Sequence, residues 1–213
     1  MNKLMKSITL IGKKVLSTVL LSLCVTTGFG QHIFNVDPVQ AAEIAAFMKQ
    51  PSAVEGKCNA EVLGIVTTAS EFSWDDINTW KNADGKVWAD GATADYAPTV
   101  FGFGFKKNAP YNGGASWICL ITNKDDDKWN PAIPGVADLK GNFILSNCNA
   151  TTVKIANSQI NTIKICMNNP TEDCYISTKR NSNLEQLDIS GSTGKLRQIE
   201  AYKNKFRDET SLV

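Results

Sequence analysis

Histidine, cysteine and carboxylate side chains are the groups through which this chain could perform catalysis or hold a metal ion. The sequence contains one histidine, His32. A Ser/His/Asp or Cys/His nucleophile would depend on that single imidazole, and no Cys-x-x-Cys spacing suggests a zinc site. The sequence therefore predicts no catalytic residue, no metal and no cofactor, and we expect a protein that is not an enzyme.

Carboxylates are abundant but have no spacing typical of a site. Glycoside hydrolysis needs two acids that face each other across a cleft, and abundance alone does not provide that. The candidates are Asp75, Asp76, Asp84, Asp90 and Asp95. The run Asp125-Asp126-Asp127 offers oxygen ligands for calcium, but lysines flank it and its spacing is not that of an EF-hand, so it is predicted to be a solvated loop.

Residues 1–30 are typical of a secretory signal peptide. They hold four lysines and no acid, and an apolar-rich run spans 15–25. Gly28 and Gly30 provide the small residues that precede a cleavage site, which predicts cleavage before Gln31 and a secreted, periplasmic or cell-surface protein with no transmembrane helix. The remaining chain would carry 18 basic and 21 acidic residues, net −3, which argues against a nucleic-acid partner.

Five cysteines remain after the leader, and cysteines of exported proteins are expected to pair. Five cannot all pair within one chain. Cys148 and Cys166 adjoin strand patterns and are predicted to be buried free thiols, whereas Cys58 and Cys119 could form a bridge. The remaining cysteine is Cys174.

All five tryptophans lie between residues 74 and 129. Three occur in apolar patterns and are predicted to be core residues: Trp74, Trp80 and Trp117. Trp88 and Trp129 stand among turn residues and are predicted to be exposed, where they would suit a platform that stacks on sugars.

Residues 31–134 are predicted to form a small α+β capping region. Asp37 and Pro38 are suited to start a helix that Pro51 stops, with an apolar stripe of Ile44, Phe47 and Met48. A second short helix is expected from Ser73 with a capping-box variant at Asp76. Strands are expected at 99–105 and 116–121.

Residues 135–213 contain short apolar pairs with i, i+2 spacing that recur at intervals of ten to thirteen positions. The pairs are Phe143/Leu145, Val153/Ile155, Ile163/Ile165, Cys174/Ile176, Leu187/Ile189 and Ile199/Ala201. Two strands to a turn give a repeat of about 20–25 residues, the range of leucine-rich repeats. Asparagines follow many pairs, where a buried amide can bond the backbone of the turn (Asn147, Asn157, Asn168 and Asn204). The alternative is a β-sandwich, whose strands recur at similar spacing.

Four segments carry a resemblance to secreted bacterial leucine-rich-repeat proteins: 139–148, 153–160, 183–190 and 199–206. The stretch 47–64, FMKQPSAVEGKCNAEVLG, resembles the helical segment that precedes such arrays. The resemblance implies non-catalytic binding of a protein or a surface glycan. The chain departs from the family because valine and isoleucine replace many of the expected leucines. An insertion from Pro170 through Arg180 also interrupts the regular spacing of the apolar pairs.

The sequence thus predicts an α+β protein with a short leucine-rich-repeat β-solenoid, acting as a secreted or cell-surface interaction module. The binding residues expected on outward strand positions are Lys154, Lys164, Asp188, Glu200 and Tyr202, and Trp88 and Trp129 are added from the capping region. One alternative is a glycan-binding or glycan-active domain in 65–134 with the repeats as a spacer. Another is a truncated copy of a longer repeat protein.

Overall fold

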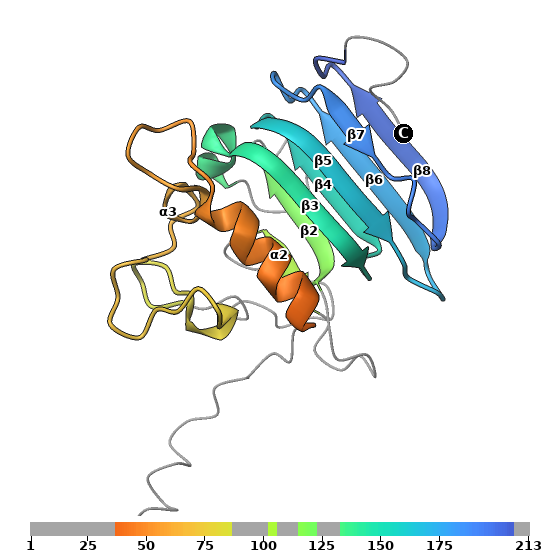
Figure 1. Cartoon of the computed structure of the whole chain (residues 1–213). Coiled ribbons are helices and arrows are strands. Elements are labelled where there is room, and N and C mark those ends of the chain that lie inside the picture. Colours follow the sequence, from red (N-terminus) through yellow and green to blue (C-terminus); the bar gives the residue numbers. More distant parts are fainter. Residues whose placement is uncertain (1–36, 87–101, 106–114, 123–132, 207–213) are drawn as a thin grey trace, which may run out of the picture. The chain divides into compact units, whose positions relative to one another are not determined.

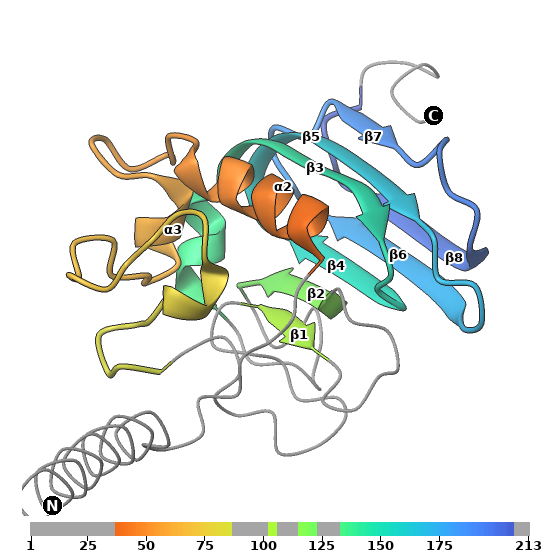
Figure 2. The ribbon, with the colours of Figure 1, turned by 60° about the horizontal axis from the view of Figure 1, so that its bottom comes forward.

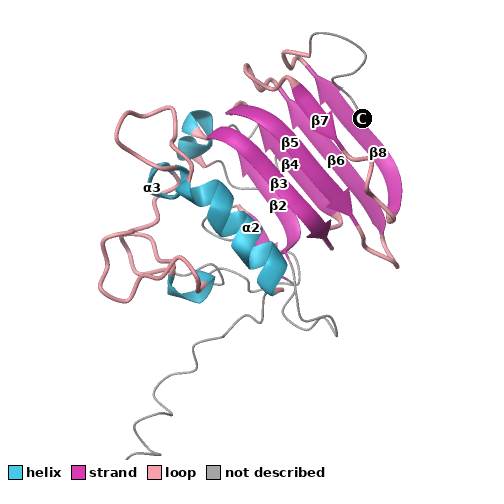
Figure 3. Ribbon diagram, in the orientation of Figure 1, coloured by secondary structure: helices cyan, strands magenta, loops and turns pink. Residues whose placement is uncertain are grey.

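Helices gather in the first part of the chain and strands in the later part, which confirms the α+β class (Figure 3). The computed structural model describes residues 37–86, 102–105, 115–122 and 133–206. Trp88 and Trp129 lie outside these ranges. So do the leader, residues 99–101, Asp90, Asp95 and the run Asp125-Asp126-Asp127.

The helix predicted after Asp37 is α2 (Pro38–Lys49). Asp37 Oδ1 accepts a hydrogen bond of 2.9 Å from the backbone N–H of Gln40, so this carboxylate caps the helix as its position predicts. Phe47 packs edge-on against Phe143 of a neighbouring strand, with ring centroids 5.0 Å apart. The residues of the predicted apolar stripe are all buried: Ile44, Phe47 and Met48.

Three short helical turns complete the helical part of the described chain: α3 (Asn59–Val62), η1 (Ile77–Thr79) and η2 (Pro134–Asp138). The prediction of a helix that starts at Ser73 is wrong, because only the 3₁₀ turn η1 forms there. The backbone N–H of Ser73 donates to Thr79 Oγ1, and its carbonyl accepts from Trp80 Nε1. These bonds close a loop and compete with the helical pattern.

In the described part of the chain, eight strands form two sheets (Figure 1). The strands are β1 (Phe103–Phe105), β2 (Ala115–Ile121), β3 (Lys140–Cys148), β4 (Thr152–Ala156), β5 (Gln159–Met167), β6 (Asp173–Lys179), β7 (Gln186–Asp188) and β8 (Lys195–Tyr202). One sheet has the order β1-β2-β4-β6-β8 and the other the order β3-β5-β7. The strand predicted at 116–121 is β2, and β1 covers the described end of the strand predicted at 99–105.

Every strand pair except β1–β2 is parallel, and from β2 onward successive strands alternate between the two sheets. Figure 2 shows the sheets as two layers, with β3, β5 and β7 over β4, β6 and β8. A β-sandwich is built from antiparallel strands, so this pairing does not favour that alternative.

The register of the five-stranded sheet repeats along the chain. Val153 pairs with Ile176 and Ile176 with Ile199, so the same step along the sequence leads from β4 to β6 and from β6 to β8. In the three-stranded sheet Phe143, Ile163 and Leu187 stand in one row. These inward residues, apart from Ile199, are buried between the sheets.

The segment from Pro170 through Arg180 is not an insertion, and that prediction is wrong. It contains β6, whose Cys174 and Ile176 are both buried. The segment keeps the register with β4 and β8. The rhythm looked interrupted because the loop between β5 and β6 contains a proline and no other apolar residue.

The turns that follow β4, β6 and β8 share one backbone conformation. Asn157, Arg180 and Lys203 have φ values of 59°, 54° and 57°. A left-handed conformation is uncommon for residues other than glycine, and here it recurs with the same step as the strand register. Successive turns are therefore built alike.

Asparagines stack behind these turns. Asn181 Nδ2 donates to the carbonyl of Ile155 at 3.0 Å, and Asn204 Nδ2 donates to the carbonyl of Thr178 at 2.9 Å. Asn204 Oδ1 in turn accepts from the backbone N–H of Asn181 at 3.1 Å. The amides thus satisfy backbone groups that leave the strand ladder.

The prediction that an asparagine amide bonds the backbone of the turn is confirmed for Asn204. Asn168 Nδ2 donates to Asn147 Oδ1 at 3.1 Å on another turn, so these two residues stack side chain on side chain. Asn157 instead supplies the left-handed turn residue. Asn181, which the sequence pattern missed, donates from the next turn to the backbone at the end of β4.

Side chains from α2 and from the residue that follows it cover the edge of β3. Gln50 pairs with the backbone of Asn142: its Nε2 donates to the carbonyl at 2.8 Å, and its Oε1 accepts from the N–H at 2.8 Å. Glu43 Oε2 accepts from the N–H of Ser146 at 2.9 Å. These side chains replace the neighbouring strand that β3 lacks on this side.

Candidate functional site

Side chains of β4, β6 and β8 alternate between the interior and the outer face of the five-stranded sheet. Val153, Ile155 and Ile176 point inward and are buried, so the residues between them point outward. Matched across the strands, the outward residues form three rows: Thr152, Tyr175 and Gln198; Lys154, Ser177 and Glu200; Ala156, Lys179 and Tyr202. We call these nine residues the outer face of the five-stranded sheet.

A polar network holds one end of this outer face. Lys179 Nζ lies 2.6 Å from Glu200 Oε2 and 5.2 Å from the ring centroid of Tyr202. Ser177 Oγ donates to Glu200 Oε2 at 3.2 Å, and Gln198 Nε2 donates to Glu200 Oε1 at 2.7 Å. Glu200 is therefore fixed by three side chains, and Tyr202 is held in place by the cation above its ring.

The same contacts fix the charges of the network. The hydrogen bond to Glu200 raises the pKa of Lys179, and the hydrogen bond from Lys179 lowers the pKa of Glu200. Both groups stay ionised around neutral pH as a result. Neither group has a pKa near neutrality that would suit it to general acid or base catalysis.

Two tyrosines are the exposed large hydrophobic side chains on this face. Tyr175 is 41% exposed and Tyr202 is 43% exposed. Tyrosine offers a flat apolar surface together with a polar group, a combination common at binding interfaces. Lys154, one row away from Tyr175, is half-buried. The face therefore presents flat apolar surface and polar groups side by side.

The five binding residues predicted on strands do not form one patch. Lys154, Glu200 and Tyr202 lie on the five-stranded sheet, whereas Lys164 and Asp188 lie on the three-stranded sheet. Lys164 Nζ is 2.8 Å from Asp188 Oδ2. That contact, with hydrogen bonds from Ser190, lowers the pKa of Asp188 to about 2. The opposite charges of Lys164 and Asp188 are therefore paired with each other.

Asp76, Trp74 and Trp80 of the capping region have local structural contacts. Asp76 Oδ1 accepts from the N–H of Asn78 and caps η1. Trp80 is fully buried, as predicted. Trp74 packs edge-on against Trp80, with Lys49 Nζ 5.4 Å from its ring. Trp74 and Trp117 are only half-buried, so the prediction of core residues holds for them in part.

All five cysteines of the described chain are free thiols, so Cys58 and Cys119 form no bridge. Cys148 is fully buried, as predicted, whereas Cys166 is free but only half-buried. Burial raises the pKa of the Cys148 thiol to about 12. A thiol that remains protonated at neutral pH is a poor nucleophile.

Sequence reasoning missed Tyr175 and Lys179 because they fall in the segment interpreted as an insertion. The signal that could have found them is the spacing of Ile176, which stands midway along the chain between Val153 and Ile199. That equal spacing places Tyr175 and Lys179 on a strand, at outward positions.

Among the described residues, no group of three or more histidine, cysteine or acidic side chains is arranged to hold a metal ion. None of the described helices combines the length and the apolar character needed to cross a membrane. No family model matches the chain, and no curated protein or solved structure matches it significantly.

Proposed function

We propose that the chain is an exported, non-enzymatic interaction module whose two sheets form a short leucine-rich-repeat solenoid. Two features support the solenoid. Successive strands from β2 onward alternate between the sheets, and the register advances by the same step from β4 to β6 and, beyond a bulge after Cys174, from β6 to β8. That step is 23 positions, as the stacked Asn181 and Asn204 also show, and leucine-rich repeats have lengths of about 20–29 residues.

The binding surface that we propose is the outer face of the five-stranded sheet, and its ligand is a protein or a surface glycan. The observation that carries this proposal is the exposure of Tyr175 and Tyr202 beside the fixed pair of Lys179 and Glu200. Side chains that are already ordered lose little conformational entropy on binding. Lys164 and Asp188 are left out of this surface because they lie on the other sheet.

A glycan and cell-surface binding screen with the chain that starts at Gln31 tests the proposal. Tyr175→Ala and Tyr202→Ala should each weaken a detected interaction by about tenfold or more. Gln186→Ala is the matched control, because Gln186 is exposed on the three-stranded sheet. Equal losses in the control and in the tyrosine variants would contradict this surface.

The alternative of a glycan-active domain in 65–134 gains no support from the described residues. Asp76 is used as a cap, and Trp88 and Trp129 lie outside the described ranges. On our proposal, the purified chain turns over no substrate in a panel for glycosidases, proteases and esterases. Turnover that disappears on changing Asp75 or Asp84 would favour the alternative.

Export is part of the proposal and rests on the leader pattern. The mass of the protein recovered from its native host should correspond to a chain that starts at Gln31 or within a few residues of it. A product that retains Met1 would contradict export.

A further inference from the structure

The edge of β8 exposes a side chain whose counterparts are buried in the strands before it. Ile118, Val153 and Ile176 occupy the same inward row of the five-stranded sheet and are at most 1% exposed. Ile199, the next residue of that row, is 43% exposed. The difference arises because each earlier residue has a strand on both sides, whereas the described chain provides β8 with a neighbour only on the side of β6.

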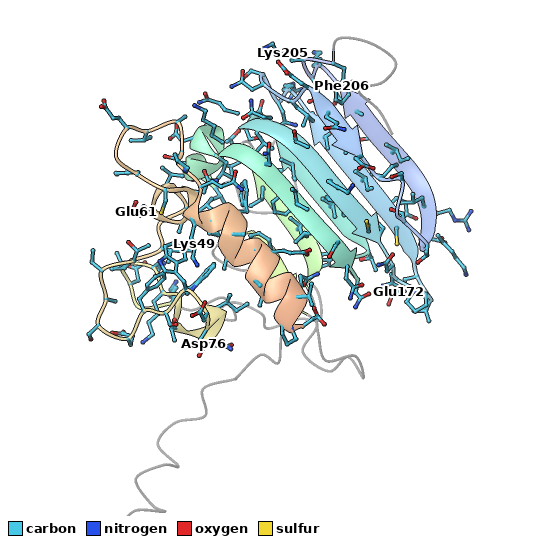
Figure 4. The ribbon with its side chains drawn as sticks, in the orientation of Figure 1. Lys49, Glu61, Asp76, Glu172, Lys205 and Phe206 are labelled. Carbon is cyan, nitrogen blue, oxygen red and sulfur yellow. The ribbon has the colours of Figure 1, made fainter. Side chains whose placement is uncertain are left out.

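The chain directly after β8 follows the course of the earlier turns. Lys203 has the left-handed conformation of Asn157 and Arg180. The N–H of Lys205 then donates to the carbonyl of Leu184 at 3.0 Å, next to the three-stranded sheet. Figure 4 places Lys205 and Phe206 at the end of the sheets remote from α2. Residues 203–206 therefore leave the edge of β8 accessible rather than folding over it.

Two lysines flank this edge. Lys195 begins β8 and Lys203 follows its last residue, and neither makes an ion pair with a described carboxylate. The other cations nearby are paired: Arg197 Nε lies 2.8 Å from Asp173 Oδ2, and Lys205 Nζ lies 3.0 Å from Glu185 Oε1. The edge thus offers an apolar centre with a positive charge at each end.

The charges distinguish between possible occupants. A second copy that paired its own β8 antiparallel, centred on Ile199, would bring Lys195 beside Lys203 at both ends, and like charges directly opposite destabilise a sheet. A head-to-tail copy would bring β8 to β1, the other edge of the five-stranded sheet, and the three residues of β1 include no carboxylate that could meet Lys195 or Lys203. The pattern instead complements an extended segment with acidic ends.

We propose that the edge of β8 binds an extended segment of another protein that has alternate aliphatic residues between acidic ends. Its backbone would extend the five-stranded sheet, as in strand addition to an exposed edge. Its aliphatic side chains would cover Ile199 and Ala201, and its carboxylates would meet Lys195 and Lys203. This edge is separate from the outer face proposed above, so either proposal can fail alone.

A synthetic peptide of about ten residues, long enough to span β8, tests this inference. It carries valine and isoleucine at alternate positions, as in β4, and glutamates at both ends. Fluorescence anisotropy at low salt should show saturable binding to the full chain. Ile199→Arg should weaken that binding at least tenfold, whereas Ile144→Arg should not, because Ile144 is equally exposed at 43% but lies on the three-stranded sheet.

A charge exchange keeps the test independent of any folding defect in Ile199→Arg. The double variant Lys195→Glu/Lys203→Glu should bind the glutamate-flanked peptide at least tenfold more weakly and should prefer a lysine-flanked peptide. Equal binding of both peptides would overturn the inference. So would binding that appears only in a chain ending at Phe206, which would assign the edge to residues 207–213, or a dimer that Ile199→Arg dissociates, which would assign it to a second copy.

Discussion

The edges of β3 and β8 lie at opposite ends of the strand array, and they differ in what covers them. At β3, Gln50 and Glu43 bond the backbone of Asn142 and Ser146. At β8, the inward Ile199 is 43% exposed. Amide and carboxylate side chains of a helical segment cover the edge of β3, whereas the edge of β8 has the side-chain pattern of an internal strand without a neighbouring strand.

Parallel repeats leave the same problem at each end, namely unpaired backbone groups and uncovered aliphatic side chains. The first end solves both, because α2 brings Phe47 over the core while neighbouring polar side chains reach the backbone. The second end relies more on ion pairs between strands, such as Lys164 with Asp188 and Lys179 with Glu200. Such pairs contribute little each when exposed.

The strongest predicted effect is on stability, where truncating an aliphatic side chain of an interior strand should cost more than truncating one of β8. Ile155→Ala and Ile176→Ala should each lower the free energy of unfolding by about 2–5 kcal/mol. Ile199→Ala should cost less, because its side chain is already partly in water. Urea unfolding measures the losses, with Lys154→Ala as the outward control at under about 0.5 kcal/mol. Equal losses at Ile176 and Ile199 would remove the difference between the ends.

A smaller loss of stability is expected when the buried amide of Asn59, near α2, is removed. Asn59 is fully buried, and its Nδ2 donates to the carbonyls of Phe47 and Lys140 at 2.9 and 2.8 Å. Asn59→Ala should cost about 1–3 kcal/mol, because these carbonyls lose their partners away from water. Asn204→Ala, at the half-buried end of the ladder, should cost less in the same urea measurement. The reverse order would contradict the comparison.

A smaller effect tests whether Gln50 replaces a strand. In Gln50→Ala, the amide of Asn142 should exchange its hydrogen about tenfold faster, because it loses its hydrogen-bond acceptor. Gln186→Ala should leave that rate unchanged. Hydrogen exchange followed by nuclear magnetic resonance gives both rates, and an unchanged rate in Gln50→Ala would show that Gln50 does not protect the edge.

The weakest predicted effect is the loss of stability at low pH that follows from the ion pair between Lys164 and Asp188. The pKa of Asp188 is lowered to about 2 in the folded chain, below the value of about 3.9 expected when unfolded. The ion pair therefore stabilises the fold above about pH 4 and loses that contribution as the pH falls toward 2. Asp188→Asn should lower the free energy of unfolding slightly at neutral pH, since Lys164 is solvated. The variant should also flatten this part of the pH profile of urea unfolding, and an unchanged profile would contradict the assignment.

Much of the strand array could be predicted from local patterns. The pairs Phe143/Leu145 and Val153/Ile155 are buried as their spacing predicts, because side chains alternate along a strand whatever its neighbours are. The cap at Asp37 is likewise local, since its acceptor and donor are close in the sequence. The predicted helix at Ser73 failed because Trp80 and Thr79 bond its backbone instead.

The grouping of the binding residues could not be predicted in the same way. Lys154 and Lys164 hold equivalent positions in successive apolar pairs, yet they lie on different sheets. Lys179 and Glu200 are farther apart in sequence and form an ion pair. Asn181 joined the asparagine stack although no apolar pair directly precedes it.

Local sequence patterns are enough to predict which side chains alternate, where α2 begins and which residues are apolar enough to be buried. The choice of neighbouring strands, the continuation of the repeat through β6, the cover over the edge of β3 and the exposure of Ile199 appear only in the folded chain. Alternation and capping depend on bonds within a few residues, whereas strand neighbours depend on turns that bring distant parts of the chain into register.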